Sequence, residues 1–533
     1  MYRSLINSLK QQPFFLALLP VFFIYSGYNE LFGFLSPLFV LLNAAWVITG
    51  IAVLYVTAWI FFRNRQQAAL FTFFVSAFLL LFGFLHDVLK KAVVLKAITS
   101  YTFILPLVLL LVVLFAVLLK RKTSGYTGTY LYLNVLMLAL LLSEIPNTIK
   151  RYRLDKSVHN LIDFRFTTFQ EFHPPAPLPD SLKPDIYFLV FDAMASSASL
   201  RETMNKDNTA LDSFLRQQGF YVIQKSSANY NWTIHSISTT LNMQYLPEFI
   251  APVMHDPKAY FWGSASILNN SLTTILRNEG YRISQYQPIS FSNPDWPYRT
   301  FFHDLQAQHF FFKTFPGRIY KDIFWNYTRV NLKAVKSIQA SLMSQRNQAR
   351  LLEVQNTMRL IKQSCSGTGT PRFIYGHFML PHDPYTFDRT GKLLPIDPDQ
   401  PVQETADEPA AYFEQVLFAN RLIEEAVTYI RQNNRRNTVI VVAGDHGYKY
   451  YKKQQSTYTF QNLNAVYFPD HNYSPLYDSL SPVNTFRVIL NKYFRTDLPL
   501  LKDSSILVTE EKETIIRLKK TEPVHSPSIP GQR

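Results

Sequence analysis

Asp445 and His446 place a carboxylate and an imidazole directly after an uncharged apolar run, with Gly444 before them and Gly447 after them. Both side chains are common zinc ligands. Open α/β sheets build their sites at the carboxyl ends of strands, and glycine lets the backbone turn sharply beside an ion. The segment therefore indicates a metal site, but Asp-His-Gly is a short motif that needs further ligands from elsewhere in the chain.

A second carboxylate follows another apolar run, because the uncharged stretch Ile186–Phe191 leads straight into Asp192. The same strand-end argument makes Asp192 a candidate metal ligand at the carboxyl edge of the sheet. The alternative is that Asp192 caps the start of a helix, a position that aspartate fills well.

A stretch rich in hydroxyl groups, residues 227–243, passes from a polar loop into a predicted helix that Thr233 heads. A hydroxyl at a helix N-terminus is favoured as a nucleophile, because the helix dipole stabilises an alkoxide and the free amides can bind phosphate oxygens. We therefore expect Thr233 to be the nucleophile, with Ser236 and Thr239 as second choices. A plain Ser/Thr helix cap is the alternative.

Two histidines, His377 and His382, lie on either side of Pro381 at the end of the predicted strand Arg372–Phe378. Neutral imidazoles bind zinc, and protonated imidazoles bind phosphate. A single histidine in such a place is often structural, whereas two of them favour a site.

The elements that must position these residues are short apolar strands that alternate with helical stretches after residue 185. The predicted strands are Ile186–Phe191, Phe220–Gln224, Arg282–Tyr286, Arg372–Phe378, Thr438–Ala443 and Leu463–Phe468. The predicted helices include Leu211–Gln217, Ser271–Asn278, Ala349–Gln363 and Pro409–Gln432. This alternation predicts a mostly parallel sheet that is covered by helices on both faces.

The N-terminal region differs in kind, since it consists of uncharged runs separated by short charged loops. The runs are Gln11–Asn29, Leu31–Phe62, Gln66–Leu85, Tyr101–Leu119 and Tyr126–Ser143. Each is long enough to cross a bilayer as a helix, at roughly 17–25 residues per crossing. We therefore predict about five transmembrane helices.

Basic residues in the short loops predict the orientation of these helices, because such residues gather on the cytoplasmic side. One side carries Arg3, Lys10, Arg63, Arg65, Lys120, Arg121 and Lys122, and the other carries only Lys90, Lys91 and Lys96. With the N-terminus inside the cell, an odd number of crossings places everything after about residue 146 outside the cytoplasm.

The chain thus divides into a transmembrane domain over residues 1–145, a proline-rich linker over 146–184, a catalytic domain over 185–500 and a partly disordered tail over 501–533. Cys365 is the only cysteine, so no disulfide can form within the chain, which fits a bacterial cell envelope. The net charge of +15 suits anionic headgroups. Nucleic acid is rejected as a partner, because the predicted site is exported.

Residues 296–327 are unusually aromatic and carry interleaved cations. One interpretation is an insertion that packs on the core of the catalytic domain. The other is an interfacial patch that dips its rings into the outer leaflet and places its cations on headgroups.

Together these residues resemble the alkaline phosphatase/sulfatase superfamily, and within it the membrane-anchored branch of lipoteichoic acid synthases and lipid A phosphoethanolamine transferases. The stretch His377-x-x-x-Pro381-His382-x-Pro384-Tyr385 and the later Gly-Asp-His-Gly stretch occur in the family's order. The resemblance covers residues 185 to about 495, and the five apolar runs match the branch in architecture. It implies an α/β fold, in which transmembrane helices precede a sulfatase-like domain with a mostly parallel sheet.

By position, the resemblance implies that Asp192, Asp445, His446 and the oxygen of Thr233 bind one divalent metal ion, Zn²⁺ or Mn²⁺. It also implies that Thr233 is the catalytic nucleophile. The transferases often have glutamate where this chain has Asp192, so the preference for one metal stays open.

The resemblance further implies that His377 and His382 bind the substrate phosphate or a second ion. Sulfatases convert a Cys or Ser within a C/S-x-P-x-R motif to formylglycine. Neither Cys365 nor Thr233 lies in such a motif. Sulfate-ester hydrolysis by formylglycine is therefore disfavoured.

The predicted function is transfer of a phospholipid headgroup, phosphoethanolamine or phosphoglycerol, to a hydroxyl of an envelope glycan or lipid through a covalent threonine intermediate. The partners would be a membrane phospholipid donor and a glycan or lipid acceptor. The protein would be a multi-pass protein of the bacterial inner membrane with its catalytic domain on the periplasmic or extracellular side. The alternatives are a phosphodiesterase, phosphatase or sulfatase-like hydrolase of the same superfamily, and a catalytically inactive envelope scaffold.

Overall fold

The computed structural model divides the chain into two compact units, a helical unit (Met1–His159 and His303–Val335) and a sheet unit (Asn160–Phe302 and Lys336–Arg533). The structure describes residues 2–30, 37–92, 98–121, 125–170, 178–246, 263, 266–268, 270–286, 311–325, 333–367, 369–396, 408–449, 455–511 and 515–521.

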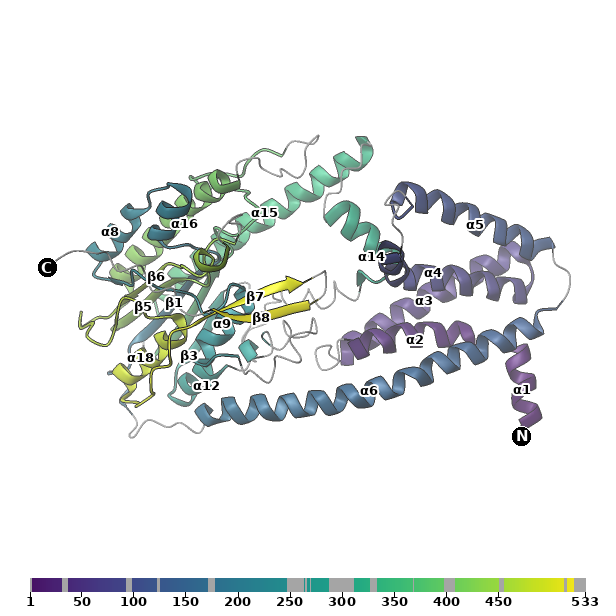
Figure 1. The fold of residues 1–533 in the computed structure, drawn as a ribbon, viewed down its shortest axis with the longest axis horizontal. Helices are drawn as coiled ribbons and strands as arrows, with labels where there is room; N and C mark the ends of the chain where they lie inside the picture. The colour runs from purple at the N-terminus through teal and green to yellow at the C-terminus, as the bar shows by residue number, and fades with distance from the viewer. Residues whose placement is uncertain are drawn as a thin grey trace. The chain divides into compact units, whose positions relative to one another are not determined.

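The helical unit is built from the apolar N-terminal runs (Figure 1). Its helices are α1 (Tyr2–Gln11), α2 (Phe15–Glu30), α3 (Pro37–Phe62), α4 (Arg65–Ala92), α5 (Tyr101–Arg121) and α6 (Thr127–Gln170). Phe15 of α2 packs edge-on against Phe73 of α4 and Tyr130 of α6, with ring centroids 5.1 Å apart in both pairs. Much of the remaining apolar surface of α3 and α5 is exposed, which suits contact with lipid.

Four helices of the described residues are long and apolar enough to cross a membrane, namely Val40–Phe62, Arg65–Ala92, Tyr101–Arg121 and Thr127–Lys150. They confirm four of the predicted spans. The fifth, predicted over residues 11–29, corresponds to the shorter apolar helix α2.

Helix α6 does not end where the predicted linker begins at residue 146. It continues through Pro146 to Gln170, because the sequence that follows holds no further proline until residue 174. The predicted proline-rich stretch lies outside the described residues as far as residue 177.

The aromatic segment expected over residues 296–327 is described over residues 311–325, which include α14 (Phe315–Ile319) and the π-helix η2 (Tyr320–Trp325). This part belongs to the helical unit. Phe315 packs on Phe78 and Phe82 of α4, with ring centroids 5.3 and 4.9 Å away. The described segment therefore packs on α4 within the helical unit.

The sheet unit has a six-stranded sheet in the order β2-β6-β5-β1-β4-β3. Its strands are β1 (Asp185–Phe191), β2 (Tyr221–Val222), β3 (Arg282–Tyr286), β4 (Arg372–Phe378), β5 (Thr438–Gly444) and β6 (Asn464–Tyr467). Strands β3, β4, β1 and β5 are parallel, whereas β6 and β2 are antiparallel to their neighbours. The predicted mostly parallel sheet is confirmed.

Alternate residues of β1 enter two separate cores, as expected when both faces of a strand are covered. Leu189 and its neighbours on that face pack under α7 (Ser197–Met204), α8 (Thr209–Gln217), α15 (Lys333–Ser364) and α16 (Glu408–Asn433). Phe188 and its neighbours pack under α9 (Thr233–Asn242), α12 (Ser271–Asn278) and α18 (Pro482–Phe494). The site can therefore open only along an edge of the sheet.

Two further elements complete the described fold, the short helix α17 (Gln455–Tyr458) and a hairpin of β7 (Ser505–Glu511) and β8 (Ile515–Thr521). The hairpin lies in the predicted C-terminal tail. Its first strand is attached to the sheet unit, because the amide of Ile506 donates to the carbonyl of Asn229 at 2.9 Å.

Candidate metal and nucleophile site

The strand order brings the predicted site residues to one edge of the sheet. Strand β1 lies between β4 and β5, and all three run in the same direction. In this register Val190 is paired with His377 on one side and with Ala443 on the other. Asp192, which follows β1, therefore lies two residues beyond the level of His377 of β4 and beside the two residues that follow β5.

The side chains converge. Asp192, His377 and Asp445 each offer a ligand atom, and these three atoms lie within 4.8 Å of one another. His446 Nε2 is 3.6 Å from Asp192 Oδ1 and 3.6 Å from Asp445 Oδ2, and His377 Nε2 is 3.6 Å from Asp192 Oδ2. Thr233 Oγ1 is 3.3 Å from Asp192 Oδ2 and 3.5 Å from His446 Nε2.

This group fits a divalent cation. Asp192, His377, Asp445 and His446 are all buried. Two of their atoms, His377 Nε2 and Asp445 Oδ2, have no hydrogen-bond partner among the described residues. A buried carboxylate without a counter-charge is costly, and two of them within one cluster would be stabilised by a doubly charged ion.

The protonation states also suit ligand roles. Burial would raise the pKa of Asp192, but the surrounding histidines, His382 foremost, hold that pKa below its ordinary value. Burial lowers the pKa of His446, which favours the neutral ring. His446 Nδ1 is 2.7 Å from the carbonyl oxygen of Gly447, so Nδ1 carries the proton and Nε2 keeps a lone pair that faces the carboxylates.

The main chain fixes the second carboxylate. Asp445 Oδ1 accepts from the amides of Ala193 and His446, each at 2.9 Å, so Oδ2 is the oxygen left for an ion. Ala193 has a φ of 63°, a left-handed conformation that is uncommon for a residue with a side chain. This strained position aims the Ala193 amide at Asp445.

Gly444 and Gly447, on either side of Asp445 and His446, are required for close packing and not for the predicted sharp turn. Neither Gly444 nor Gly447 has a positive φ. A Cβ at Gly444 would lie 2.2 Å from the carbonyl oxygen of Met194, and one at Gly447 would lie 2.6 Å from that of Tyr458. Close packing of neighbouring main chain therefore requires glycine at both positions.

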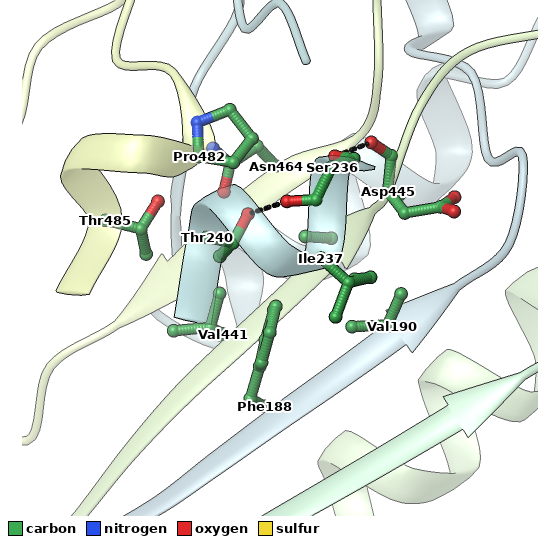
Figure 2. Close-up of a pocket in the computed structure, with 12 residues that line it drawn as sticks. Phe188, Val190, Ser236, Ile237, Thr240, Val441, Asp445, Asn464, Pro482 and Thr485 are labelled. Carbon is green, nitrogen blue, oxygen red and sulfur yellow. Dashed lines mark hydrogen bonds between the residues drawn. The ribbon is translucent and has the colours of Figure 1, made fainter. Parts of the chain in front are cut away.

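Thr233 is the first residue of α9. Trp232 is the N-cap of this helix, and its side chain makes no capping hydrogen bond. The second-choice nucleophiles are placed differently. Ser236 donates to the main-chain carbonyl of Asp445, and the Asp445 carboxylate points to the other side of that main chain (Figure 2). Thr239 is fully buried, and its oxygen has no partner among the described residues. Thr233 is thus the hydroxyl that faces the carboxylates.

His382 lies at the rim of the cluster, where its side chain is 22% exposed. Its Nδ1 is 2.7 Å from the carbonyl oxygen of Asp383, which leaves Nε2 available to a ligand. His377, by contrast, is buried and lies among the candidate metal ligands. Its Nδ1 is 2.7 Å from the hydroxyl of Tyr375.

The family model described as Sulfatase matches residues 188–486, more than half of the chain. The chain belongs to the sulfatase family. This membership confirms the predicted resemblance to the alkaline phosphatase/sulfatase superfamily and the predicted fold class. All six predicted site residues lie inside the matched range.

Solved structures with similar folds include two periplasmic domains of EptC and one sulfatase. The C-terminal periplasmic domain of EptC from Escherichia coli is 11% identical over 66% of this chain and 96% of that chain, with a TM-score of 0.38. The same domain of phosphoethanolamine transferase EptC from Campylobacter jejuni is 10% identical over 60% and 91%, with a TM-score of 0.36. The putative sulfatase yidJ from Bacteroides fragilis is 13% identical over 62% and 77%, with a TM-score of 0.37. No curated protein sequence matches the chain.

Sequence reasoning missed two residues of this sulfatase domain that hold the His382 loop. Arg350 of α15 donates to the carbonyls of Met379 at 2.9 Å, His382 at 3.2 Å and Pro384 at 2.6 Å. Gln415 of α16 also donates to the His382 carbonyl, at 3.2 Å. Burial lowers the pKa of Arg350 to about 10, so it remains a cation at neutral pH. No motif marks these residues, because both act on main-chain carbonyls.

Proposed function

We propose that this sulfatase-family protein transfers the headgroup of a membrane phospholipid, phosphoethanolamine or phosphoglycerol, to a hydroxyl of an envelope glycan or lipid. The intermediate would be a phosphodiester of Thr233. The observation that supports this most directly is the position of the Thr233 hydroxyl, 3.3 Å from Asp192 within a group of buried carboxylates and imidazoles.

Asp192, Asp445, His446 and the Thr233 oxygen would hold one divalent ion, with His377 as a further donor on the same side of the cluster. When bound, Zn²⁺ or Mn²⁺ would lower the pKa of the threonine hydroxyl and neutralise charge on phosphate oxygens. Main-chain groups form hydrogen bonds to His446 and Asp445. These bonds keep both side chains in place before the ion binds.

In the first step, the hydroxyl proton of Thr233 leaves to solvent and Oγ1 forms a bond to the donor phosphorus. The bond between phosphorus and the diacylglycerol oxygen breaks, and protonated His382 gives its proton to that leaving oxygen. In the second step, the acceptor hydroxyl attacks phosphorus, its proton passes to His382, and the Thr233 oxygen departs and regains a proton. Arg350 and Gln415 keep the loop of His382 in position.

The helical unit supports a membrane location for this reaction. Between the end of α4 and the end of the apolar part of α6, the chain would cross the membrane twice, once in α5 and once in α6. These two helix ends would therefore lie on the same side of the membrane. In the short loops between the helices, that side carries Lys90 and Lys91, whereas the opposite side carries Arg63, Arg65, Lys120 and Arg121. The positive-inside rule then supports a bacterial inner-membrane protein whose sheet unit follows α6 on the outer side.

The test is mass spectrometry of the Thr233 peptide after the full-length protein meets vesicles of phosphatidylethanolamine or phosphatidylglycerol. A headgroup phosphate on Thr233 that disappears when a glycan acceptor is added supports the transferase. Release of free headgroup phosphate without an acceptor would indicate the hydrolase. Thr233→Ala is the matched control, and a parent protein that binds no metal and carries no adduct would indicate a scaffold.

A further inference from the structure

Residues 311–325 interrupt the sulfatase domain in sequence, between β3 and α15, yet they belong to the helical unit. Figure 1 shows α14 beside α4. The amide of Gly83 donates to the carbonyl of Lys313 at 2.8 Å, and a Cβ at Gly83 would lie 2.6 Å from that oxygen. This close approach fixes the segment at the depth of the last turns of α4.

Polar contacts complete the attachment. Arg318 forms an ion pair with Asp87 of α4. The hydroxyl of Tyr101, at the start of α5, donates to Asp322 at 2.6 Å, and Lys90 is 4.0 Å from the same carboxylate. Both carboxylates of this contact are therefore already paired with groups of the protein.

Two cations of the same region have no such partner in the part of the chain that the structure describes. Among the described residues, no carboxylate lies within ion-pair distance of Lys91 or Lys321, and the Lys321 ammonium lies 5.6 Å from the centre of the Phe312 ring. Lys91 is exposed. The ion pairs of Arg318 and Lys90 therefore leave the positive charges of Lys91 and Lys321 close to the end of α4 and the start of α5.

Large aromatic side chains of the same elements are also exposed, namely Phe84 of α4 (74%), Phe311 (44%) and Tyr320 (37%), and the last two form a ring pair. Aromatic rings next to lysines at the end of a spanning helix are typical of the headgroup level of a bilayer, where rings contact acyl chains and amines contact phosphates. We name Phe84, Lys91, Phe311, Tyr320 and Lys321 the headgroup surface.

We propose that the headgroup surface binds anionic phospholipids at the membrane surface where α4 ends and α5 begins. Lys91 and Lys321 supply the charge that a phosphate requires, and an ammonium forms short, strong hydrogen bonds to phosphate oxygens. Continuity with α4 and α5 selects a bilayer lipid as the source of that phosphate. The residues of this surface belong to the helical unit, whereas Thr233 and the proposed metal ligands belong to the sheet unit.

The proposal is tested with the full-length protein in nanodiscs of phosphatidylcholine and phosphatidylglycerol in equal amounts. A photoreactive label is attached to the Phe84→Cys variant, and the unsubstituted chain serves as the labelling control, since its only cysteine, Cys365, is buried. We expect the label to capture phosphatidylglycerol in preference to phosphatidylcholine. Lys91→Gln/Lys321→Gln in this background should lower the preference by about fivefold per lysine.

The matched control is Arg216→Gln/Lys392→Gln, which removes two exposed cations of the sheet unit and should leave the preference unchanged. Size-exclusion chromatography checks that each variant is folded. Equal capture of both lipids by the parent, or equal effects of the two double variants, would overturn the proposal. So would loss of the preference on adding inorganic phosphate at constant ionic strength, because the amines would then bind a free anion.

Discussion

Strand β1 has a buried aspartate at its first residue and another directly after its last, and the fold treats the two carboxylates in opposite ways. Asp185 accepts from the Arg372 amide at 3.0 Å, from Arg372 Nε at 3.2 Å and from Asn434 at 3.1 Å, and Arg436 lies 3.3 Å away. Asp192 has histidines around it, and no lysine or arginine of the described residues lies within ion-pair distance.

The contrast separates a structural carboxylate from one that is left for a ligand. This fold can bring two guanidinium groups to a buried aspartate, and it does so at the amino end of the sheet, away from the proposed chemistry. At the carboxyl end it brings a second carboxylate instead. Folding of that end is therefore less favourable until a cation binds, which is a common cost of functional sites.

The strongest test of the contrast is Asp192→Asn. Transfer activity should fall by about a thousandfold or more, equivalent to about 4 kcal/mol of barrier, because the proposed ion loses a charged ligand. The free energy of unfolding of the metal-free protein should not fall. Zn²⁺ or Mn²⁺ should raise the melting temperature of the parent but not that of the variant. An Asp192→Asn protein with parental activity would remove the carboxylate from the site.

The reverse outcome is expected for Asp185→Asn. This change leaves Arg372 and Arg436 beside a neutral amide, and breaking a buried ion pair costs about 3–5 kcal/mol. Denaturant unfolding should show this loss, while the metal-induced rise in melting temperature persists in the protein that remains folded. An unfolding free energy equal to the parent's would contradict the structural role of this carboxylate.

A third test uses His235, a buried imidazole two residues after Thr233 whose ring nitrogens have no partner among the described residues. Burial lowers its pKa to about 4. Because this pKa lies below the unfolded value, the neutral ring stabilises the fold above about pH 6.5, and that stability is lost as the pH falls toward 4. The loss should be on the order of 3 kcal/mol.

The measurement compares the pH dependence of unfolding for the parent and His235→Phe, both in chelator so that loss of metal does not contribute. The variant should lose less stability between pH 6.5 and pH 4. Identical slopes for the two proteins would show that His235 does not titrate on unfolding.

The smallest expected effect concerns Ala193, whose left-handed backbone presents its amide to Asp445. Ala193→Gly should relieve strain and raise stability by up to about 1 kcal/mol with activity retained. Ala195→Gly is the matched control at a buried position without positive φ, and it should lower stability by about 0.5–1 kcal/mol. Calorimetry that shows equal losses in both variants would argue against strain at Ala193.

The strands were predictable because their apolar runs end sharply. β3 and β4 have the predicted bounds, and the predicted bounds of β5 differ from the observed ones only at Gly444. Helix α15 begins at Lys333, well before the predicted start at Ala349, although Val335, Ile338 and Leu342 already repeat at helical spacing in its first turns.

The site was predictable in its residue types and not in its arrangement. Asp192, Asp445 and His446 could be proposed because each follows an apolar strand. Their convergence depends on β1 lying between β4 and β5, and local sequence does not encode which strands are neighbours. The same adjacency places His377 among the candidate metal ligands, where the family resemblance had assigned it to the substrate phosphate or to a second ion.

The packing of α14 on α4 has a practical consequence for the isolation of the sulfatase domain by itself. A soluble fragment that begins after α6 would still carry residues 311–325, but Phe315 would lose the rings of Phe78 and Phe82 against which it packs. Arg318 would lose Asp87 as well. Such a fragment would present a bare aromatic face to water and would tend to self-associate unless that stretch were redesigned or shortened.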